Sequence, residues 1–521
     1  FFCRRPRCTR IYRRHSRIME KEAPLVSKLE RRFSQPELKG ETNTKWRSSG
    51  IVCTLGPGSQ DVKMMEKLIE AGLDVARFNF SHGSHEYQKK LMDNVREAAS
   101  NVGKMIALAL DTKGPEIRTG TFTENEDGSD EYELKKGSST IVTVDEKLAN
   151  SGTAEKFWVT YEDLPNTVKP GMTIFIDDGL IALEVEKIEE TDVHCVVKNG
   201  GIISNRKGVN LPGAKVTLPA LSEKDKEDIK FGVSQKVDII FASFIRKADD
   251  VKEIRKLIPE ETIIISKIEN QEGIDNFDDI LEASDGIMVA RGDLGIEIDA
   301  TQVFVQQKRM IRACRAAAKP VIVATQMLQS MVSNPRPTRA EVSDVANAIL
   351  DGADCVMLSG ETAKGKYPVE AVQQMSETCR VAEENLSLPV IVQDKFSERE
   401  DIVRCACNLA KSQNAKAIVL ITHTGKTARF TSRHRPSCPV IAVIPSTKIH
   451  VARHLSLTFA IQVVTYEESE DGTQLSASSR IATALKSQVG LLVSKGDLIV
   501  CMYSTPGFRE FANIIEVQKV P

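Results

Sequence analysis

Short apolar runs alternate with longer helical patterns from about residue 49 onward. The runs are continuous, which is typical of parallel strands buried on both faces. The predicted strands are Ile51–Leu55, Val75–Phe80, Met105–Leu110, Val237–Ala242, Thr262–Ser266, Gly286–Ala290, Pro320–Ala324 and Cys355–Leu358. The predicted helices are Asp61–Ala71, His85–Ala99, Ser222–Ser234, Asp249–Ile258, Gly273–Glu282, Gln302–Ala317, Arg339–Asp351 and Val369–Glu384. This α/β rhythm favours a closed (β/α)8 TIM barrel over a doubly wound open sheet.

The rhythm stops between residues 115 and 212. Apolar and polar residues alternate there, with turn signals at Asp177–Gly179 and Asn199–Gly201. This pattern predicts an inserted all-β lid domain over the mouth of the barrel, which then comprises residues 45–114 and 213–388. A second α/β pattern over residues 389–521 indicates a separate C-terminal domain. Its predicted strands are Ala417–Thr422, Val440–Val443, Ile461–Thr465 and Leu498–Tyr503.

Residues 1–44 form a predicted N-terminal extension, and we expect its start to be disordered. The first eighteen residues hold seven arginines and no acidic residue, which is typical of an organelle transit segment. The alternative is a stretch that precedes the true start of the protein, with Met19 as the initiator.

Charge and cysteine usage argue against several classes of protein. The 70 basic and 72 acidic residues nearly cancel, so no net field favours nucleic acid or a membrane surface as a partner. No apolar run approaches the roughly 18 residues of a membrane span. The closest cysteines, Cys405 and Cys407, have neither the redox nor the zinc spacing. Several others lie in apolar runs, so we expect a reducing, cytoplasmic location, with organellar import as the alternative.

Two neighbouring predicted strands carry the clearest chemistry. Lys267 and Glu269 lie at the carboxyl end of the fifth strand, and their spacing of two directs both side chains to one side. The sixth strand ends in Arg291, Gly292 and Asp293, just before a predicted turn. Two carboxylates suit a hard ion such as Mg2+, and a fixed lysine beside it suits charge on a transferring phosphoryl group. The alternative is a surface ion pair.

The second and third strands also end in polar residues. Arg77, Asn79 and Ser81 fall at alternate positions and so share one face. Asp111 and Thr112 end the third strand. The amide, hydroxyl and carboxylate oxygens make a candidate site for a monovalent cation, and Arg77 could clamp a phosphate. Polar capping of strand ends is the alternative for any one of these residues.

Three further residues follow the sixth, seventh and eighth strands. Gly292 would let a backbone N–H come close to an anion such as a carboxylate. Thr325 and Ser359 are small hydroxyls that could pass a proton through water. Taken alone, each residue type is more often a satisfied strand-end hydroxyl than a proton relay.

The residues around these positions resemble the pyruvate kinase family. The motifs that carry the resemblance are IVCTLGPGS, ARFNFSHG, LDTKGPEIRTG, KGVNLPG, ISKIEN, MVARGDLG, VATQML and LSGETAKGKYP. Their order and separation match the family over nearly the whole chain from about Lys45. The resemblance implies a barrel, a mobile lid, a C-terminal domain and usually a homotetramer. It also implies transfer of phosphate from phosphoenolpyruvate to ADP, giving pyruvate and ATP at the end of glycolysis.

The resemblance implies roles for single residues as well. Lys267 would stabilise the transferring phosphoryl group, and Arg77 would bind the substrate phosphate. Glu269 and Asp293 would hold Mg2+ or Mn2+. The further substrate contacts that it implies are Gly292, Asp293 and Thr325, with Thr325 and Ser359 near the path that protonates the enolate. The implied K+ ligands are Asn79, Ser81, Asp111 and Thr112. The implied nucleotide contacts are Asn79, His82, Arg118 and Lys207, the last two closing the lid on Mg2+–nucleotide.

Two alternative functions explain these residues less well. A catalytically inactive paralogue that senses sugar phosphates should have lost Lys267, Glu269 or Asp293, and the chain keeps all three. Another barrel enzyme of phosphoenolpyruvate or pyruvate chemistry, such as an aldolase, would not explain the lid or the K+ ligands.

A candidate phosphate cradle lies in the C-terminal domain. Hydroxyls, a glycine and a lysine open a predicted helix there, namely Thr422, Thr424, Gly425, Lys426 and Thr427. An ordinary capped turn is the alternative. The resemblance implies a sugar-phosphate effector, and in relatives activated by fructose 1,6-bisphosphate a Trp, an Arg and a longer Gly-rich loop meet the rest of the sugar. Since this chain has no Trp after Trp158 and its loop Ser504–Arg509 is short, we expect a monophosphate such as glucose 6-phosphate to activate better.

Overall fold

The computed structural model describes residues 46–125, 128–388, 397–468, 476–487, 492–505 and 511–521. The predicted N-terminal extension and most of the loop Ser504–Arg509 lie outside these residues. Within the described ranges, no helix has the length and apolar character needed to cross a membrane.

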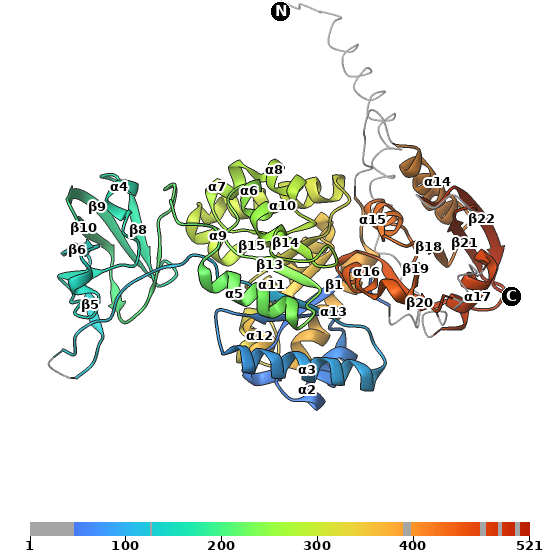
Figure 1. The fold of residues 1–521 in the computed structure, drawn as a ribbon, viewed down its shortest axis with the longest axis horizontal. Helices are drawn as coiled ribbons and strands as arrows, with labels where there is room; N and C mark the ends of the chain where they lie inside the picture. The colour runs from blue at the N-terminus through green and yellow to red at the C-terminus, as the bar shows by residue number, and fades with distance from the viewer. Residues whose placement is uncertain (1–45, 126–127, 389–396, 469–475, 488–491, 506–510) are drawn as a thin grey trace, which may run out of the picture. The chain divides into compact units, whose positions relative to one another are not determined.

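Eight parallel strands close into a barrel in the order β1-β17-β16-β15-β14-β13-β3-β2, with helices around it (Figure 1). The strands are β1 Gly50–Thr54, β2 Val75–Asn79, β3 Ala107–Asp111, β13 Ile239–Ala242, β14 Ile263–Ile268, β15 Gly286–Ala290, β16 Val321–Ala324 and β17 Cys355–Leu358. All eight were predicted, and their ends differ from the prediction by no more than two residues. The predicted (β/α)8 barrel is therefore confirmed.

Each barrel strand is buried on both faces, as continuous apolar runs predict. One layer of side chains fills the barrel interior, including Phe241 and Met288, which are both 0 % exposed. A second and larger layer lies between the strands and the surrounding helices, and it includes Phe78 and Phe277. These two cores hold the carboxyl ends of all eight strands at one rim.

The barrel helices agree with the prediction at most positions. The long ones are α2 Val62–Ala71, α3 His85–Val102, α5 Glu223–Ser234, α6 Ala248–Arg255, α10 Ala300–Ala316, α11 Arg339–Asp351 and α13 Pro368–Glu384. The predicted helix Gly273–Glu282 was wrong in one respect, because the structure has α7 Gln271–Asp275 and α8 Phe277–Ala283 instead. Asn276 separates the two and donates its side-chain amide to the carbonyl of Arg246 at 2.9 Å, which fixes the break.

The predicted turn after the sixth strand was also wrong. Helix α9, Arg291–Glu297, begins directly at the end of β15, and a short helix α12, Gly360–Ala363, follows β17 in the same way. Gly292 and Asp293 therefore lie in the first turn of a helix, where backbone N–H groups point away from the helix body.

The inserted segment forms a seven-stranded sheet in the order β4-β12-β8-β9-β10-β6-β7 and a two-stranded sheet, β11-β5. The strands are β4 Ile117–Arg118, β5 Tyr132–Leu134, β6 Ser139–Thr143, β7 Lys156–Trp158, β8 Thr173–Ile176, β9 Ile181–Glu189, β10 Asp192–Asn199, β11 Gly201–Ile203 and β12 Gly208–Asn210. A single helical turn, α4 Leu164–Thr167, interrupts an otherwise β architecture. The alternating residues point inward to a separate core around Phe157 and Leu183.

The C-terminal segment holds a five-stranded sheet in the order β20-β19-β18-β21-β22. Its strands are β18 Ala417–Ile421, β19 Val440–Pro445, β20 Ile461–Tyr466, β21 Leu498–Tyr503 and β22 Ile514–Lys519. Its helices are α14 Glu398–Ser412, α15 Lys426–Arg433, α16 Ile449–His454 and α17 Ala477–Lys486. Strand β22, which pairs antiparallel with β21, was not predicted, because it is a partly exposed edge strand without a continuous apolar run.

A buried ion pair joins the barrel to the C-terminal sheet. Asp354, just before β17, accepts a hydrogen bond from Arg435 Nη1 at 2.8 Å and another from Val321 N at 3.0 Å. The two charged side chains are only 5 % and 6 % exposed. Removal of one partner would therefore leave a charge without compensation in a medium of low dielectric constant.

We expect Arg435→Met to lower the free energy of unfolding by about 3–5 kcal/mol, since it strands the Asp354 carboxylate. Urea unfolding followed by circular dichroism measures this loss. Arg380→Met is the matched control, because Arg380 pairs with Glu377 and Glu384 on the exposed surface of α13, and such pairs contribute under about 1 kcal/mol. Equal losses in the two variants would contradict the assignment of a buried structural pair.

Candidate active site

Three predicted site residues meet at the carboxyl rim of the barrel. Arg77 Nε donates to Asp111 Oδ2 at 2.6 Å, and Lys267 Nζ donates to Asp111 Oδ1 at 3.2 Å. They come from β2, β3 and β14, which the closed barrel brings to one edge. Both Lys267 and Arg77 are 8 % exposed, whereas Asp111 is 1 % exposed. The alternative of a surface ion pair is therefore excluded for Lys267.

Arg77 keeps part of its guanidinium available. Its Nη1 donates to Thr54 Oγ1 at 2.8 Å, in addition to the bond from Nε to Asp111. Among the described residues Nη2 has no protein acceptor, so it can still donate to a phosphate oxygen.

Ser243 links two of these groups and was not predicted. Its Oγ accepts from Lys267 Nζ at 2.7 Å and donates to the carbonyl of Thr112 at 2.7 Å. Asp111 Oδ1 lies 3.2 Å from the same hydroxyl. Ser243 directly follows β13, so the strand-end argument applied to the fourth strand would have identified it.

Lys267 and Glu269 form a buried ion pair, and their surroundings shift the pKa of each group. Nζ lies 3.0 Å from Oε1. Burial opposes the charged form of Lys267, but the carboxylates of Asp111 and Glu269 outweigh burial and raise its pKa. Burial raises the pKa of Glu269 to about 7, and Asp293 adds to this rise while Lys267 opposes it. Lys267 is thus a fixed cation, and the carboxylates of Glu269 and Asp293 repel each other.

The donor set fits a hard divalent ion. Oε1 of Glu269 is buried and, although Lys267 Nζ lies 3.0 Å away, makes no bond of hydrogen-bond geometry. The carboxylate of Asp293 raises the pKa of Glu269 by electrostatic repulsion, so the field of one carboxylate reaches the other. Among the described residues no group of three or more His, Cys, Asp or Glu side chains could hold a metal. Mg2+ commonly binds through one or two carboxylates and completes its shell with water and substrate phosphate.

Thr325 and Gly292 lie against each other. Gly292 N donates to Thr325 Oγ1 at 2.7 Å, and Thr325 Oγ1 donates to the carbonyl of Ala324 at 2.5 Å. The backbone N–H of Gly292, which was expected to approach an anion, thus faces the hydroxyl of Thr325. That hydroxyl keeps one lone pair for a water or a substrate group.

Ser359 lies at the end of β17 with a hydroxyl that is buried and without a protein partner. Its backbone N–H donates to Glu361 Oε2 at 2.7 Å, and Glu361 Oε1 accepts from Leu328 N at 3.1 Å. Glu361 is fully buried and was not predicted, although it stands in the motif LSGETAKGKYP. An unpartnered hydroxyl at this rim is available to water or substrate.

The end of β2 places the remaining candidate oxygens at the rim. Asn79 Oδ1 accepts from Ser81 N at 3.0 Å, which orders the turn. Gln88 donates its side-chain amide to the carbonyls of Asn79 and His82 at 3.0 and 2.8 Å. His82 itself is exposed. Asn79 pairs with Asp111 in the register of β2 and β3, Thr112 follows Asp111 directly, and Ser81 lies two residues beyond Asn79.

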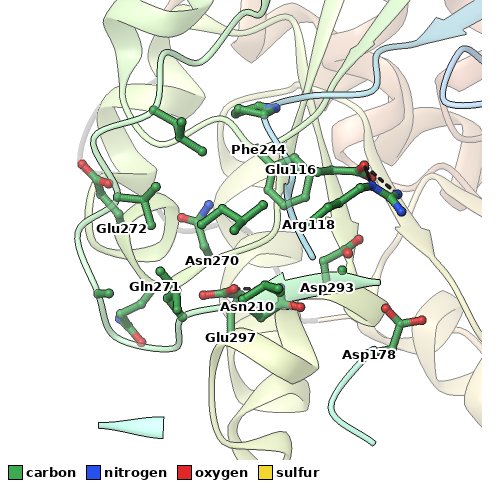
Figure 2. A pocket seen from close by; sticks show the side chains of 18 of the residues that line it. Glu116, Arg118, Asp178, Asn210, Phe244, Asn270, Gln271, Glu272, Asp293 and Glu297 are labelled. Carbon is green, nitrogen blue, oxygen red and sulfur yellow. Dashed lines mark hydrogen bonds and ion pairs between the residues drawn. The ribbon is translucent and has the colours of Figure 1, made fainter. Parts of the chain in front are cut away.

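A cavity of about 280 Å³ lies between the inserted sheet and the barrel rim, and Figure 2 shows side chains that line it. Arg118 on β4 lines it, as does Lys207, the residue just before the antiparallel partner strand β12. Each is already paired, Arg118 Nε with Glu116 at 2.8 Å and Lys207 Nζ with Asp177 at 2.9 Å. The cavity thus unites two predicted nucleotide contacts.

Acidic side chains from both the barrel and the inserted segment line the same cavity. Asp293 lines it, and burial raises the pKa of Asp178 on the inserted segment, with Asp293 as the next cause (Figure 2). His82 and Asn79, the other predicted nucleotide contacts, are not among its lining residues. The structure therefore brings half of the predicted nucleotide set together in this cavity.

The candidate phosphate cradle lies at the start of α15. Gly425 adopts φ +72°, which favours glycine, and its N–H donates to Thr422 Oγ1 at 3.1 Å. Lys426 N donates to Thr424 Oγ1 at 3.4 Å. Thr427 is buried and Lys426 is exposed. The segment is therefore the start of a helix, with Lys426 at the surface and Thr427 buried.

Comparisons with known proteins agree with this geometry. The family model for the pyruvate kinase barrel domain matches residues 46–372, and the model for the pyruvate kinase alpha/beta domain matches residues 400–518. The pyruvate kinase of Leishmania mexicana is 46 % identical over 480 residues, covering 90 % of this chain and 95 % of that protein.

Two fungal proteins give the same result. The pyruvate kinase of Candida albicans is 48 % identical over 485 residues, and that of Schizosaccharomyces pombe is 46 % identical over 486 residues. Each alignment covers 90 % of this chain, with 95 % and 94 % of the respective relative. Together with the closed barrel, the inserted sheet and the cluster of charges at the rim, these matches establish that the chain belongs to the pyruvate kinase family.

Proposed function

We propose that the chain transfers the phosphoryl group of phosphoenolpyruvate to ADP, giving pyruvate and ATP, as a glycolytic enzyme. The observation that carries this proposal is the buried Lys267, held between Asp111, Glu269 and Ser243 at the barrel rim. A cation fixed in a low-dielectric site stabilises charge that develops on a transferring phosphoryl group. An inactive sugar-phosphate sensor would have no need for this arrangement.

The residues at the rim have complementary roles in the proposed reaction. Lys267 and the free Nη2 of Arg77 bind oxygens of the phosphoryl group and orient it. Glu269 and Asp293 would hold Mg2+ or Mn2+, which neutralises phosphate and carboxylate charge when bound. Thr325 and Ser359 order the water that delivers a proton to the enolate. Arg118 and Lys207 bind the phosphates of the nucleotide from the lid, and Asn79 at the end of β2 and His82 just after it contact the nucleotide.

Further proposals concern ions and assembly. Asn79, Ser81, Asp111 and Thr112 are proposed to hold K+, since three neutral oxygens and one carboxylate suit a monovalent cation. The family resemblance supports a homotetramer in the cytoplasm. The proposed domain limits are those expected from the sequence, with the lid at residues 115–212 and the C-terminal domain from residue 389.

Lys267→Met should reduce kcat by about 10²–10³-fold, because it removes one preorganised charge from the transition state. A coupled assay for pyruvate from phosphoenolpyruvate and ADP measures this. The fold should persist, since Asp111 retains Arg77 as its ion-pair partner. Near-normal kcat in a variant with an unchanged circular dichroism spectrum would refute the role of Lys267, whereas an inactive wild-type enzyme would refute the proposed function.

Activity should require K+ in addition to Mg2+, and Glu116→Lys should weaken this requirement. Glu116 lies 3.5 Å from Lys113 Nζ and accepts from Arg118 Nε. In the family a glutamate here goes with K+ dependence, and a lysine, which supplies its own positive charge, goes with independence. Rates in buffers free of K+, Na+ and NH4+ test this, with Glu124→Lys on the lid as a control for added charge. Full activity of the wild type without monovalent cations would rule out the K+ site.

A sugar monophosphate is proposed to bind at the start of α15, with Lys426 and Thr427 as phosphate contacts. Glucose 6-phosphate should therefore lower the half-saturating phosphoenolpyruvate concentration more than fructose 1,6-bisphosphate does. Lys426→Ala should abolish the response without changing kcat at saturation. Titration of both effectors at sub-saturating phosphoenolpyruvate measures this, with Lys416→Ala as the control lysine outside the cradle. An unchanged response in Lys426→Ala would remove the cradle from consideration.

A further inference from the structure

Strand β16 ends in a backbone conformation that its residues rarely adopt. Thr325 has φ +70° and Gln326 has φ +56°, so two consecutive non-glycine residues lie in the left-handed region. For a β-branched residue such as threonine this is a genuine outlier, and it persists only where the surroundings enforce it. The neighbouring groups that enforce it are therefore part of the machinery that sets the position of Thr325.

The side chain of Arg291 supplies this constraint. A guanidinium has five N–H donors in a rigid fork, and each of the five has an acceptor here. Nε donates to Ala324 O at 3.2 Å, and Nη2 donates to Thr325 O at 2.8 Å. The remaining acceptors are Gln307 Oε1, Asp344 Oδ1 and Met327 Sδ. The guanidinium thus holds the successive carbonyls of Ala324 and Thr325, where the strained backbone begins.

The backbone next to Arg291 holds the same threonine from its side-chain end. Gly292 N, the following N–H in the chain, donates to Thr325 Oγ1 at 2.7 Å. Consequently the Arg291 fork fixes the carbonyl of Thr325, and the first turn of α9 fixes its hydroxyl. The position of the Arg291 guanidinium therefore sets the direction of the free lone pair of Thr325 Oγ1.

Asp344 is the counter-charge that orients this fork. Its Oδ1 accepts from Arg291 Nη1 at 2.7 Å, and it is the acid with which Arg291 forms an ion pair among the described residues. Arg291 is 12 % exposed and Asp344 is 36 % exposed, so the pair runs from the rim toward the surface of α11. Asp344 touches none of the proposed substrate contacts directly and acts on them through Arg291.

We propose that Arg291 and Asp344 are positioning residues for the proton step, because together they hold Thr325 Oγ1 in its strained, productive place. This inference rests on the proposed function. In the proposed site, Lys267, Arg77 and the metal carboxylates supply most of the phosphoenolpyruvate contacts, and Thr325 is one contact among several. Loss of the Arg291–Asp344 pair therefore lowers kcat more than it raises KM.

Asp344→Asn tests the proposal, because it keeps the shape and removes the charge. We expect kcat to fall roughly tenfold, the size expected when a charged hydrogen bond becomes a neutral one. KM for phosphoenolpyruvate should change by less than about twofold, since most of the groups that bind the substrate equally in the ground state and the transition state are left in place. Exchange of the methyl protons of pyruvate in D2O, followed by NMR, should slow by the same factor as kcat.

Asp351→Asn is the matched control. Asp351 lies on the same helix and pairs with Lys308 of α10, so this variant also removes one carboxylate and one ion pair of α11. It should lower stability comparably while kcat stays within about twofold of the wild type, because the Asp351–Lys308 pair bonds neither Arg291 nor Thr325. Equal losses of kcat in the two variants would show a general effect of helix α11 and would overturn the proposal.

A double-mutant cycle separates positioning from stability. In a Thr325→Ala background the hydroxyl is absent, so Asp344→Asn should have no further effect on kcat or on methyl-proton exchange. A persistent tenfold effect in that background would sink the inference. If Asp344→Asn does not fold, Asp344→Glu replaces it in the same cycle. An active wild type with an unaffected Asp344 variant overturns this inference alone, whereas an inactive wild type overturns the proposed function and this inference with it.

Discussion

The charge arrangement of the candidate site depends on one buried ammonium group. Lys267 Nζ lies among Asp111 Oδ1, Glu269 Oε1 and Ser243 Oγ, at distances of 2.7–3.2 Å. Burial alone would favour the neutral amine, so the charge survives only because carboxylates from neighbouring strands converge on it. That convergence requires a closed barrel with its apolar layers intact, which is how the cores of the fold become a condition for the chemistry.

The sequence predicted the part of this site that follows from periodicity. Continuous apolar runs marked all eight strands, and polar residues at their carboxyl ends identified Lys267, Glu269 and Asp111 before any contact was known. Ser243 was not predicted, although it follows the same rule, since it comes directly after β13. The K+ and nucleotide contacts came from family resemblance and remain proposals.

The remainder could not be predicted, because it depends on dihedral angles and on partners remote in sequence. The local sequence VATQML does not indicate that Thr325 takes a left-handed conformation. Likewise, the sequence of α11 does not indicate that Asp344 lies 2.7 Å from Arg291. The same limit applies to α9, since the glycine after Arg291 suggested a turn where the chain continues as a helix. Such features arise from packing between elements, which local patterns do not record.

The pairing of lid cations with lid acids has a consequence for how a nucleotide would be recognised. Arg118 and Lys207 already have internal counter-ions, Glu116 and Asp177, on the same inserted segment. A polyphosphate that docks there exchanges one anionic partner for another, and the gain is a difference between two ion pairs rather than the full attraction of a bare cation. Such a site is less responsive to stray anions and to salt, and it rewards only a ligand whose geometry can displace both carboxylates together.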